Sequence, residues 1–136
     1  MNFSLKQPDP FVVLVDRSLG KQIIAASLRD AGFQVEVHDD HFSPDARDEE
    51  WLADVGSKGW VILTKDKRIK YRALELAAAV AARAKVFSLT AGSVQGRDMA
   101  DIFLKAMPRI KRYVAENNPP YIVRVSKGGM LSRVFP

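Results

Sequence analysis

Three aspartates in this chain of 136 residues stand where their carboxylates could meet around a cation. Asp16 closes the apolar run 11–15, and Asp66 follows the apolar run 60–64 by two residues. Asp48 opens a segment with helical spacing that leads into the second run. Because parallel strands end at one edge of a sheet, we expect the three carboxylates to converge there. Mg²⁺ or Mn²⁺ would neutralise their mutual repulsion, since both ions accept carboxylate oxygens, water and phosphate as ligands.

Metal-assisted hydrolysis is the chemistry expected of this trio. A divalent ion held by the three carboxylates can activate water for attack on a phosphodiester and stabilise the leaving oxygen. Each aspartate also has a structural explanation on its own. Asp48 could be a helix N-cap and Asp16 a turn residue after a strand. Asp66 could be a cap or could pair with Lys65 or Arg68. The metal site is favoured because all three aspartates are expected at the same edge of the sheet. Separate capping or turn roles would not require them to lie together.

Basic residues around Asp66 could position the phosphates of a nucleic acid. They are Lys65, Lys67, Arg68, Lys70 and Arg72. Tyr71 lies among them and could stack on a base. Solvation of a surface loop would explain the same charges. It is the favoured explanation for Lys105, Arg109 and Arg112, which share the polar face of a later helix.

The charge of the chain is divided unevenly along its length. Residues 1–64 hold 6 Lys/Arg and 11 Asp/Glu, whereas residues 65–136 hold 15 and 5. An acidic half that faces a basic half would suit a polyanion, with its phosphates on the basic residues. The chain has no cysteine, which excludes disulfides, a thiolate nucleophile and cysteine-ligated zinc.

Strands and helices are expected to alternate along the chain. Strands are predicted over 11–15, 33–37, 60–64 and 86–89, followed by a hairpin over 121–125 and 130–135. Helices are predicted from a Ser18 cap to Gly32, from Asp48 to the glycines at 56–59, over 73–84, and over 99–114 with a kink at Pro108. This is the pattern of a three-layer α/β/α fold with a mainly parallel sheet, in the order 2-1-3-4. The hairpin would join one edge or pack outside.

The extent and location of the protein follow from length and hydropathy. Residues 1–136 are expected to form a single domain, with 1–10 as a lead-in and 119–136 as the C-terminal hairpin. The longest apolar stretch, 76–82, is far shorter than the roughly 20 residues of a membrane span. The N-terminus also lacks the pattern of an export signal. We therefore expect a cytoplasmic protein with no membrane partner.

Several motifs resemble those of the PIN-like ribonucleases, over residues 11–115. The first is Val15-Asp16-Arg17-Ser18, the second is Asp48 followed by Trp51-Leu52, and the third is a strand ending in Thr64-Lys65-Asp66. The chain is most similar to the compact branch of VapC-type toxins of toxin–antitoxin pairs. The resemblance implies catalytic and metal-binding roles for Asp16, Asp48 and Asp66, with Mg²⁺ or Mn²⁺ as cofactor and RNA as substrate. It also implies an antitoxin protein as a partner. A homodimer is possible.

The chain also differs from that family in two places. A full PIN domain carries a glutamate on an extra helical segment, where this chain offers Asp39, Asp40 and Asp45 in a short loop. Arg68 stands where an acidic residue usually follows Asp66. Additional or supporting groups could come from Ser18, Glu49, Asp39 and Asp40. One metal ion and two metal ions are both compatible with these residues.

Other functions were weighed against the ribonuclease. A catalytically silent module could bind RNA or protein on the same fold. A phosphoacceptor receiver domain would need an aspartate where Thr64 ends its strand. His38 and His41 could bind zinc with Asp39 or Asp40, but the loop offers no third strong ligand. We therefore expect the histidines to border the crevice.

Overall fold

The computed structural model describes residues 11–20, 22–65, 72–90 and 94–136. Its six strands form one sheet in the order β3-β2-β4-β5-β6-β7. The strands are β2 (Val12–Val15), β3 (Gln34–Val37), β4 (Val61–Thr64), β5 (Lys85–Leu89), β6 (Tyr121–Val125) and β7 (Leu131–Phe135). All neighbours are parallel except the antiparallel pair β6–β7. The predicted 2-1-3-4 order is confirmed, and the hairpin extends the sheet beyond β5.

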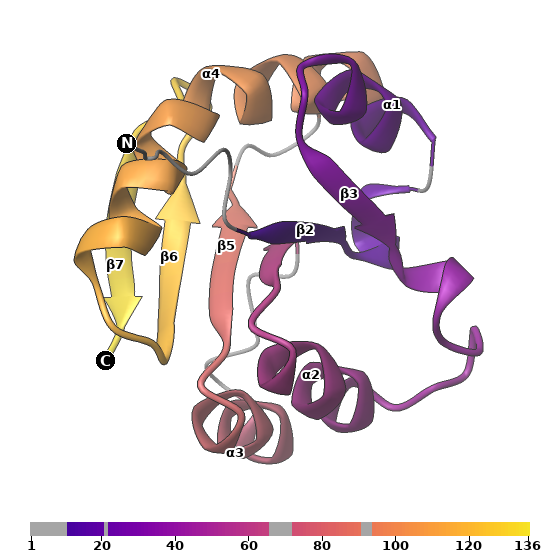
Figure 1. Ribbon diagram of the computed structural model, residues 1–136, viewed down its shortest axis with the longest axis vertical. Coiled ribbons are helices and arrows are strands. Elements are labelled where there is room, and N and C mark those ends of the chain that lie inside the picture. Colours follow the sequence, from indigo (N-terminus) through magenta and orange to yellow (C-terminus); the bar gives the residue numbers. More distant parts are fainter. Residues whose placement is uncertain (1–10, 21, 66–71, 91–93) are drawn as a thin grey trace, which may run out of the picture.

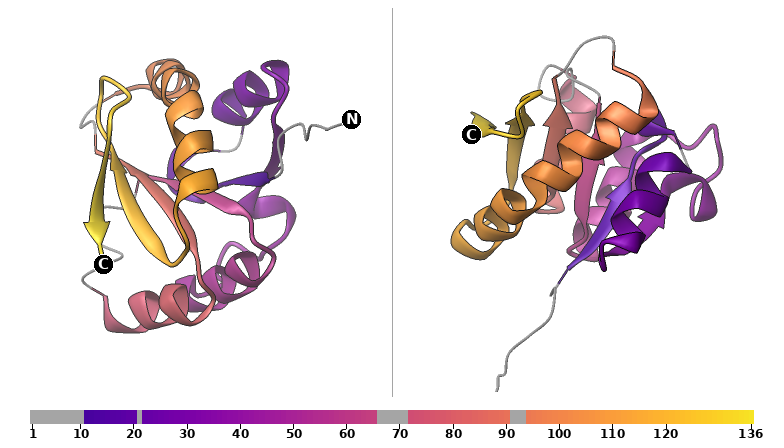
Figure 2. Two further views of the ribbon diagram at one scale, coloured as in Figure 1. Left: turned by 60° about the vertical axis from the view of Figure 1, so that its left-hand side comes forward. Right: turned by 90° about the horizontal axis from the view of Figure 1, so that it is seen from above.

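Helices cover both faces of this sheet, which confirms the three-layer α/β/α fold (Figure 1). They are α1 (Ile23–Asp30), α2 (Asp48–Ser57), α3 (Ala73–Ala81) and α4 (Gly96–Glu116). Figure 2 shows α1 and α4 on one side of the strands and α2 and α3 on the other. The longest described helix, α4, continues through Pro108. Across the described ranges, no helix has both the length and the apolar character needed to cross a membrane.

The central strands are apolar throughout because both of their faces are buried. Val15 and Leu63 face the core formed with α1 and α4. Leu14 and Ile62 alternate with them and face the core formed with α2 and α3. All four side chains are fully buried. This double burial fixes the register of β2 against β4 and places their carboxyl ends together.

The prediction that Ser18 caps the first helix is wrong. Residues Arg17–Leu19 form a short 3₁₀ turn, η1, and α1 begins only at Ile23. Gly20 separates the two with a φ of 82°, a conformation that glycine adopts at little cost. Ser18 does not cap a helix because its hydroxyl bonds elsewhere, at the edge of the sheet.

Candidate active site at the carboxyl edge of the sheet

Asp16 is fixed at the junction of the two central strands. It directly follows β2, and its backbone N–H donates to the carbonyl of Leu63 in β4 at 3.0 Å. Its side-chain Oδ2 accepts hydrogen bonds from Ser18 Oγ at 2.8 Å and from Thr64 Oγ1 at 2.7 Å. Only 8% of the residue is exposed. The carboxylate is therefore held in one orientation by groups from both strands.

The two hydroxyls are themselves held in place. The backbone N–H of Lys65 donates to Ser18 Oγ at 3.0 Å, which ties the η1 turn to the end of β4. Ser18 Oγ and Thr64 Oγ1 lie 3.2 Å apart. Each hydroxyl has a single hydrogen, and each is best placed to give it to the charged carboxylate. Thr64 is fully buried, so its position is set by the packing of the sheet.

The second carboxylate oxygen of Asp16, Oδ1, is left for another ligand. No hydrogen bond or ion pair reaches it from the described residues. Burying a carboxylate without an opposite charge is costly, and such groups are usually paired or bound to metal. A hard divalent cation accepts this type of oxygen ligand. Asp16 therefore fits the role of a metal ligand.

Asp48 lies on the first turn of α2, and Arg47 occupies the N-cap position. The interpretation of Asp48 as an N-cap is therefore wrong. Trp51 Nε1 donates to Asp48 Oδ1 at 2.9 Å, and Arg72 Nη1 lies 3.8 Å from Oδ2. Arg72 lies closer to Glu75, at 3.1 Å. Asp48 keeps 45% of its side chain exposed. Its outer oxygen is therefore only loosely paired.

The remaining predicted acids lie in ion pairs or in solvent. Asp39 Oδ1 is 3.4 Å from Arg17 Nε and 3.2 Å from His38 Nδ1. Glu49 Oε2 is 3.1 Å from Arg47 Nη2. Asp40 is exposed at the end of the short 3₁₀ turn η2 (His38–Asp40). Asp39 and Glu49 would each have to exchange a cationic neighbour for a metal ion.

The two histidines lie in different surroundings. His38 is only 1% exposed and packs edge-on against Trp51, with ring centroids 5.3 Å apart. His41 Nε2 lies 2.6 Å from Glu36 Oε1 at the surface. Each histidine therefore contacts its own carboxylate, and they share no zinc ligand set within the described residues. That the histidines border the crevice as supporting groups stays a prediction; His38 is a buried contact of the Trp51 ring, and that ring donates a hydrogen bond to Asp48.

The complete trio of aspartates cannot be followed in the structure. Asp66 falls outside the described residues, as do Lys67, Arg68, Lys70 and Tyr71. Among the residues that are described, no three His, Asp or Glu side chains gather closely enough to hold a metal ion. The meeting of Asp16, Asp48 and Asp66 therefore stays a prediction. What the structure does show is that Asp16 directly follows β2 beside the end of β4, and that Asp48 is the first residue of α2, the helix that leads into β4 (Figure 1).

Thr64 is a further residue of the candidate site, because its hydroxyl donates to Asp16. The sequence pattern indicates only that Thr64 ends a strand. The sequence does contain a hint of this contact: Thr64 ends one apolar run, and Asp16 follows the other. Knowing that these two strands are neighbours would have placed Thr64 beside Asp16.

The chain therefore has a three-layer α/β/α fold, and an aspartate held by two hydroxyls follows its first described strand. A family model described as "PIN like domain" matches residues 11–91, so the chain belongs to the PIN-like domain family. The matched segment contains all three aspartates of the predicted site.

A curated protein of Mycobacterium tuberculosis is also similar to this chain. It is described as "Putative ribonuclease VapC45" and is 27% identical over 124 residues, which cover 83% of this chain and 90% of that protein. No solved structure matches the chain significantly.

Proposed function

We propose that the protein is a metal-dependent endoribonuclease that hydrolyses phosphodiester bonds in RNA. The observation that carries this proposal is the Asp16 carboxylate, which is buried and held by two hydroxyls while Oδ1 has no partner among the described residues. Membership of the PIN-like family and the name of the mycobacterial relative support the same activity.

Asp16, Asp48 and Asp66 would hold Mg²⁺ or Mn²⁺ in this proposal. Such an ion, when bound, supplies Lewis-acid chemistry for the attack of water on the phosphodiester. Ser18 and Thr64 keep Asp16 oriented, and the Lys65 backbone keeps Ser18 in place. Asp48 would contribute its carboxylate, which now has Arg72 Nη1 3.8 Å from Oδ2, so the metal ion would compete with this guanidinium.

Basic residues next to the site would bind the RNA backbone. We assign this role to Lys65, Lys67, Arg68, Lys70 and Arg72. Arg72 has acidic neighbours in Asp48 and Glu75. An Arg72 side chain that leaves Asp48 on metal binding would become available to a phosphate at the same edge.

The biological role we propose is the toxin of a toxin–antitoxin pair in the cytoplasm. It rests on the VapC designation of the relative. A cognate antitoxin protein would then bind this chain and suppress its activity. A simple genetic test is growth arrest on expression of the chain, with relief by the Asp16→Asn substitution.

The enzymatic test is cleavage of single-stranded RNA by the purified protein in Mg²⁺, with and without EDTA. We expect cleavage that EDTA removes and that Asp16→Asn abolishes. The matched control is Asp54→Asn, which removes an exposed carboxylate paired with Lys58 near the end of α2. Cleavage that persists in EDTA, or in Asp16→Asn, would refute the proposal.

A catalytically silent RNA- or protein-binding module is the second candidate. The observation in its favour is Asp48, whose oxygens are engaged by Trp51 and Arg72. A protein that binds RNA but leaves it intact in both Mg²⁺ and Mn²⁺ would establish this alternative.

A further inference from the structure

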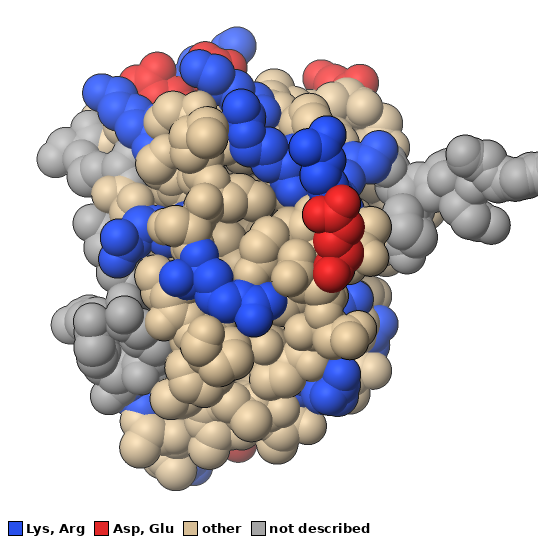
Figure 3. Space-filling model, turned by 90° about the vertical axis from the view of Figure 1, so that its left-hand side faces the viewer, with Lys and Arg blue, Asp and Glu red and all other residues tan. Residues whose placement is uncertain are grey.

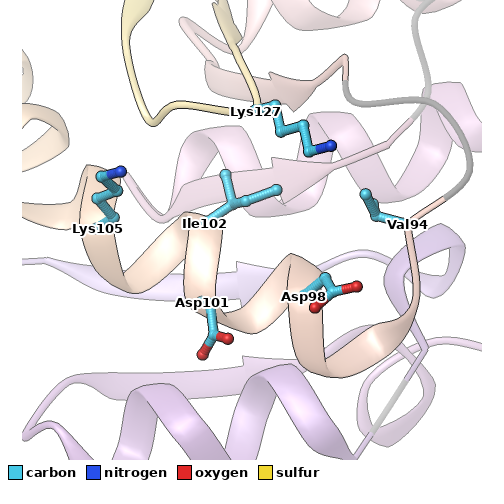
Figure 4. Close-up of a pocket in the computed structure, with 6 residues that line it drawn as sticks. All are labelled: Val94, Asp98, Asp101, Ile102, Lys105 and Lys127. Atoms are coloured by element: carbon cyan, nitrogen blue, oxygen red, sulfur yellow. The ribbon is translucent and has the colours of Figure 1, made fainter.

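A pocket of about 510 Å³ lies between α4 and the turn of the β6–β7 hairpin, away from the aspartates discussed above. We refer to it as the α4–hairpin pocket. Its lining is Val94, Asp98, Asp101, Ile102, Lys105 and Lys127. Figure 4 shows Lys127 across the hollow from Ile102 and Lys105 at the opposite end of the hollow from Val94, with the carboxylates of Asp98 and Asp101 on the side of α4 away from Lys127.

Close packing of the hairpin turn against the helix builds this pocket. Gly129 has a φ of 81°, and a Cβ added there would lie 3.3 Å from Lys105 Cγ and 3.5 Å from the Ala106 backbone nitrogen. The glycine therefore allows the turn to approach α4 closely, which brings Lys127 and Lys105 to the same hollow. Ile102 forms the base of the pocket. It is 7% exposed and packs in the core between the sheet, α1 and α4, so its position is fixed by packing.

The four charged side chains of the pocket are available to a ligand. None of them forms an ion pair or a hydrogen bond with another described residue. Two ammonium groups in the lining of one pocket, without an acidic partner among the described residues, favour anions such as phosphates. The carboxylates accept hydrogen bonds only, so their side of the pocket favours a group that carries N–H donors. The apolar side chains between them suit the face of a planar ring.

A nucleotide combines these three features. In an RNA strand the phosphates on either side of it would contact Lys105 and Lys127, and its base would lie against Ile102. A base with N–H donors on its Watson–Crick edge would then bond to Asp98 or Asp101, as single-stranded RNA is commonly recognised. Guanine presents two adjacent donors there and matches a carboxylate best. We infer that the α4–hairpin pocket binds a guanine nucleotide of the RNA next to the cleavage site, an inference that rests on the proposed function.

The position of the pocket is compatible with a strand that also reaches Asp16. Both α4 and the hairpin turn begin at the carboxyl ends of parallel strands, β5 and β6, which is the edge that carries Asp16. A second hollow, of about 340 Å³, is lined by Leu19, Gly20, Gln22, Ile23 and Gly96. It therefore lies between the turn that carries Ser18 and the first turn of α4. An RNA strand could cross this hollow from Asp16 to the pocket.

The face that α4 and the hairpin present is mainly basic. Figure 3 views the molecule from the side of α4 and the hairpin and shows more Lys and Arg than Asp and Glu. Residues 94–136 contain 8 Lys/Arg and 3 Asp/Glu. Of those three acids, two line the pocket itself. Asp98 and Asp101 are therefore exceptions on a basic face, as expected if they select a base while the lysines bind the backbone.

Binding of fluorescent single-stranded RNA tests this inference. The parent protein is the Asp16→Asn chain, so that cleavage does not interfere. The probes are a uridine oligomer of about 12 nucleotides and the same oligomer with guanosines interspersed. We expect the parent to bind the guanosine-containing oligomer about 10-fold more tightly, and Asp98→Asn or Asp101→Asn to remove most of that preference.

The lysines are tested by the double variant Lys105→Gln/Lys127→Gln. We expect about 10-fold weaker binding of both oligomers, and a salt dependence whose logarithmic slope falls by about 1.4, since two phosphate contacts are lost. The matched control is Lys58→Gln/Lys85→Gln, which removes two lysines next to the opposite edge of the sheet, where α2 ends and β5 begins. That control should bind like the parent.

The inference is overturned if the double variant at 105 and 127 binds like the parent, or if the parent binds both oligomers equally. Thermal melts of each variant show whether it is folded. Cleavage by the unmodified chain is measured separately. An absence of cleavage would refute the proposed ribonuclease, whereas the binding data would still decide the pocket.

Discussion

Asp16 and Asp48 belong to the same predicted trio, but the fold treats their carboxylates differently. Asp16 is nearly buried, and its partners are two hydroxyls and no cation among the described residues. Asp48 is half-exposed, with an indole N–H on one oxygen and a guanidinium 3.8 Å from the other. In the proposed site, Asp16 could therefore bind a cation without losing an ion pair among the described residues. Asp48 would have to exchange its cationic neighbour for the metal ion.

The largest effect is expected from Asp16→Asn. This change keeps the size of the side chain but removes the charge that would hold the metal. RNA cleavage should fall by about 10³-fold or more, as for the removal of a group that acts directly in the reaction. The measurement is the single-turnover rate in saturating Mg²⁺. Asp48→Asn should lose less if the two sites differ as described, and an equal loss would remove the distinction between them.

Thr64→Val should produce the next largest effect. Valine has nearly the same shape as threonine, but it cannot donate to Asp16 Oδ2. Loss of a partner that orients a metal ligand typically costs about 10- to 100-fold in activity or metal affinity. Raising the Mn²⁺ concentration should restore part of the rate if the hydroxyl acts by orienting Asp16. A rate equal to that of the unmodified protein would show that Ser18 alone is sufficient.

The stability of the metal-free protein should also separate the two aspartates. Asp16→Asn removes a buried charge that has no opposite charge among the described residues, so the free energy of unfolding should rise by about 1 kcal/mol. Asp48→Asn should not raise it, because that carboxylate already has favourable partners. Thermal melts in EDTA measure both changes. A melting temperature that falls in Asp16→Asn would contradict this account of the site.

The smallest effect is expected from Arg72→Gln. Removing the guanidinium frees Oδ2 of Asp48 from a competing cation, so the metal affinity should increase by about two- to three-fold. The same change should weaken RNA binding if Arg72 also contacts a phosphate. Mn²⁺ titrations with and without RNA distinguish the two effects. A decrease in metal affinity would show that Arg72 supports Asp48 and does not compete for it.

The sequence predicted the layers, the strand order and the placement of Asp16 at a strand end, because periodicity and parallel crossovers determine these features. It did not predict what each carboxylate contacts. The sequence pattern favours a helix cap for Ser18, because serine before a helical pattern often is one. Its real partner depends on the η1 turn and on the register of β2 with β4.

The other missed features depend on packing between distant segments. The contact of Asp48 with Arg72 arises where the start of α2 faces the start of α3. The α4–hairpin pocket exists because the hairpin joins the sheet edge, which the sequence left undecided. Lys105 and Lys127 could not be paired until Gly129 was seen against the helix.

Direct binding of Mn²⁺ to the purified protein tests the central claim that Asp16 is a metal ligand. Free Mn²⁺ can be followed by electron paramagnetic resonance during a titration, without RNA and without any need for activity. We predict binding by the unmodified chain and by the Asp54→Asn control, and at least about 10-fold weaker binding by Asp16→Asn. Equal affinity in Asp16→Asn, or no binding by the unmodified chain, would contradict the account.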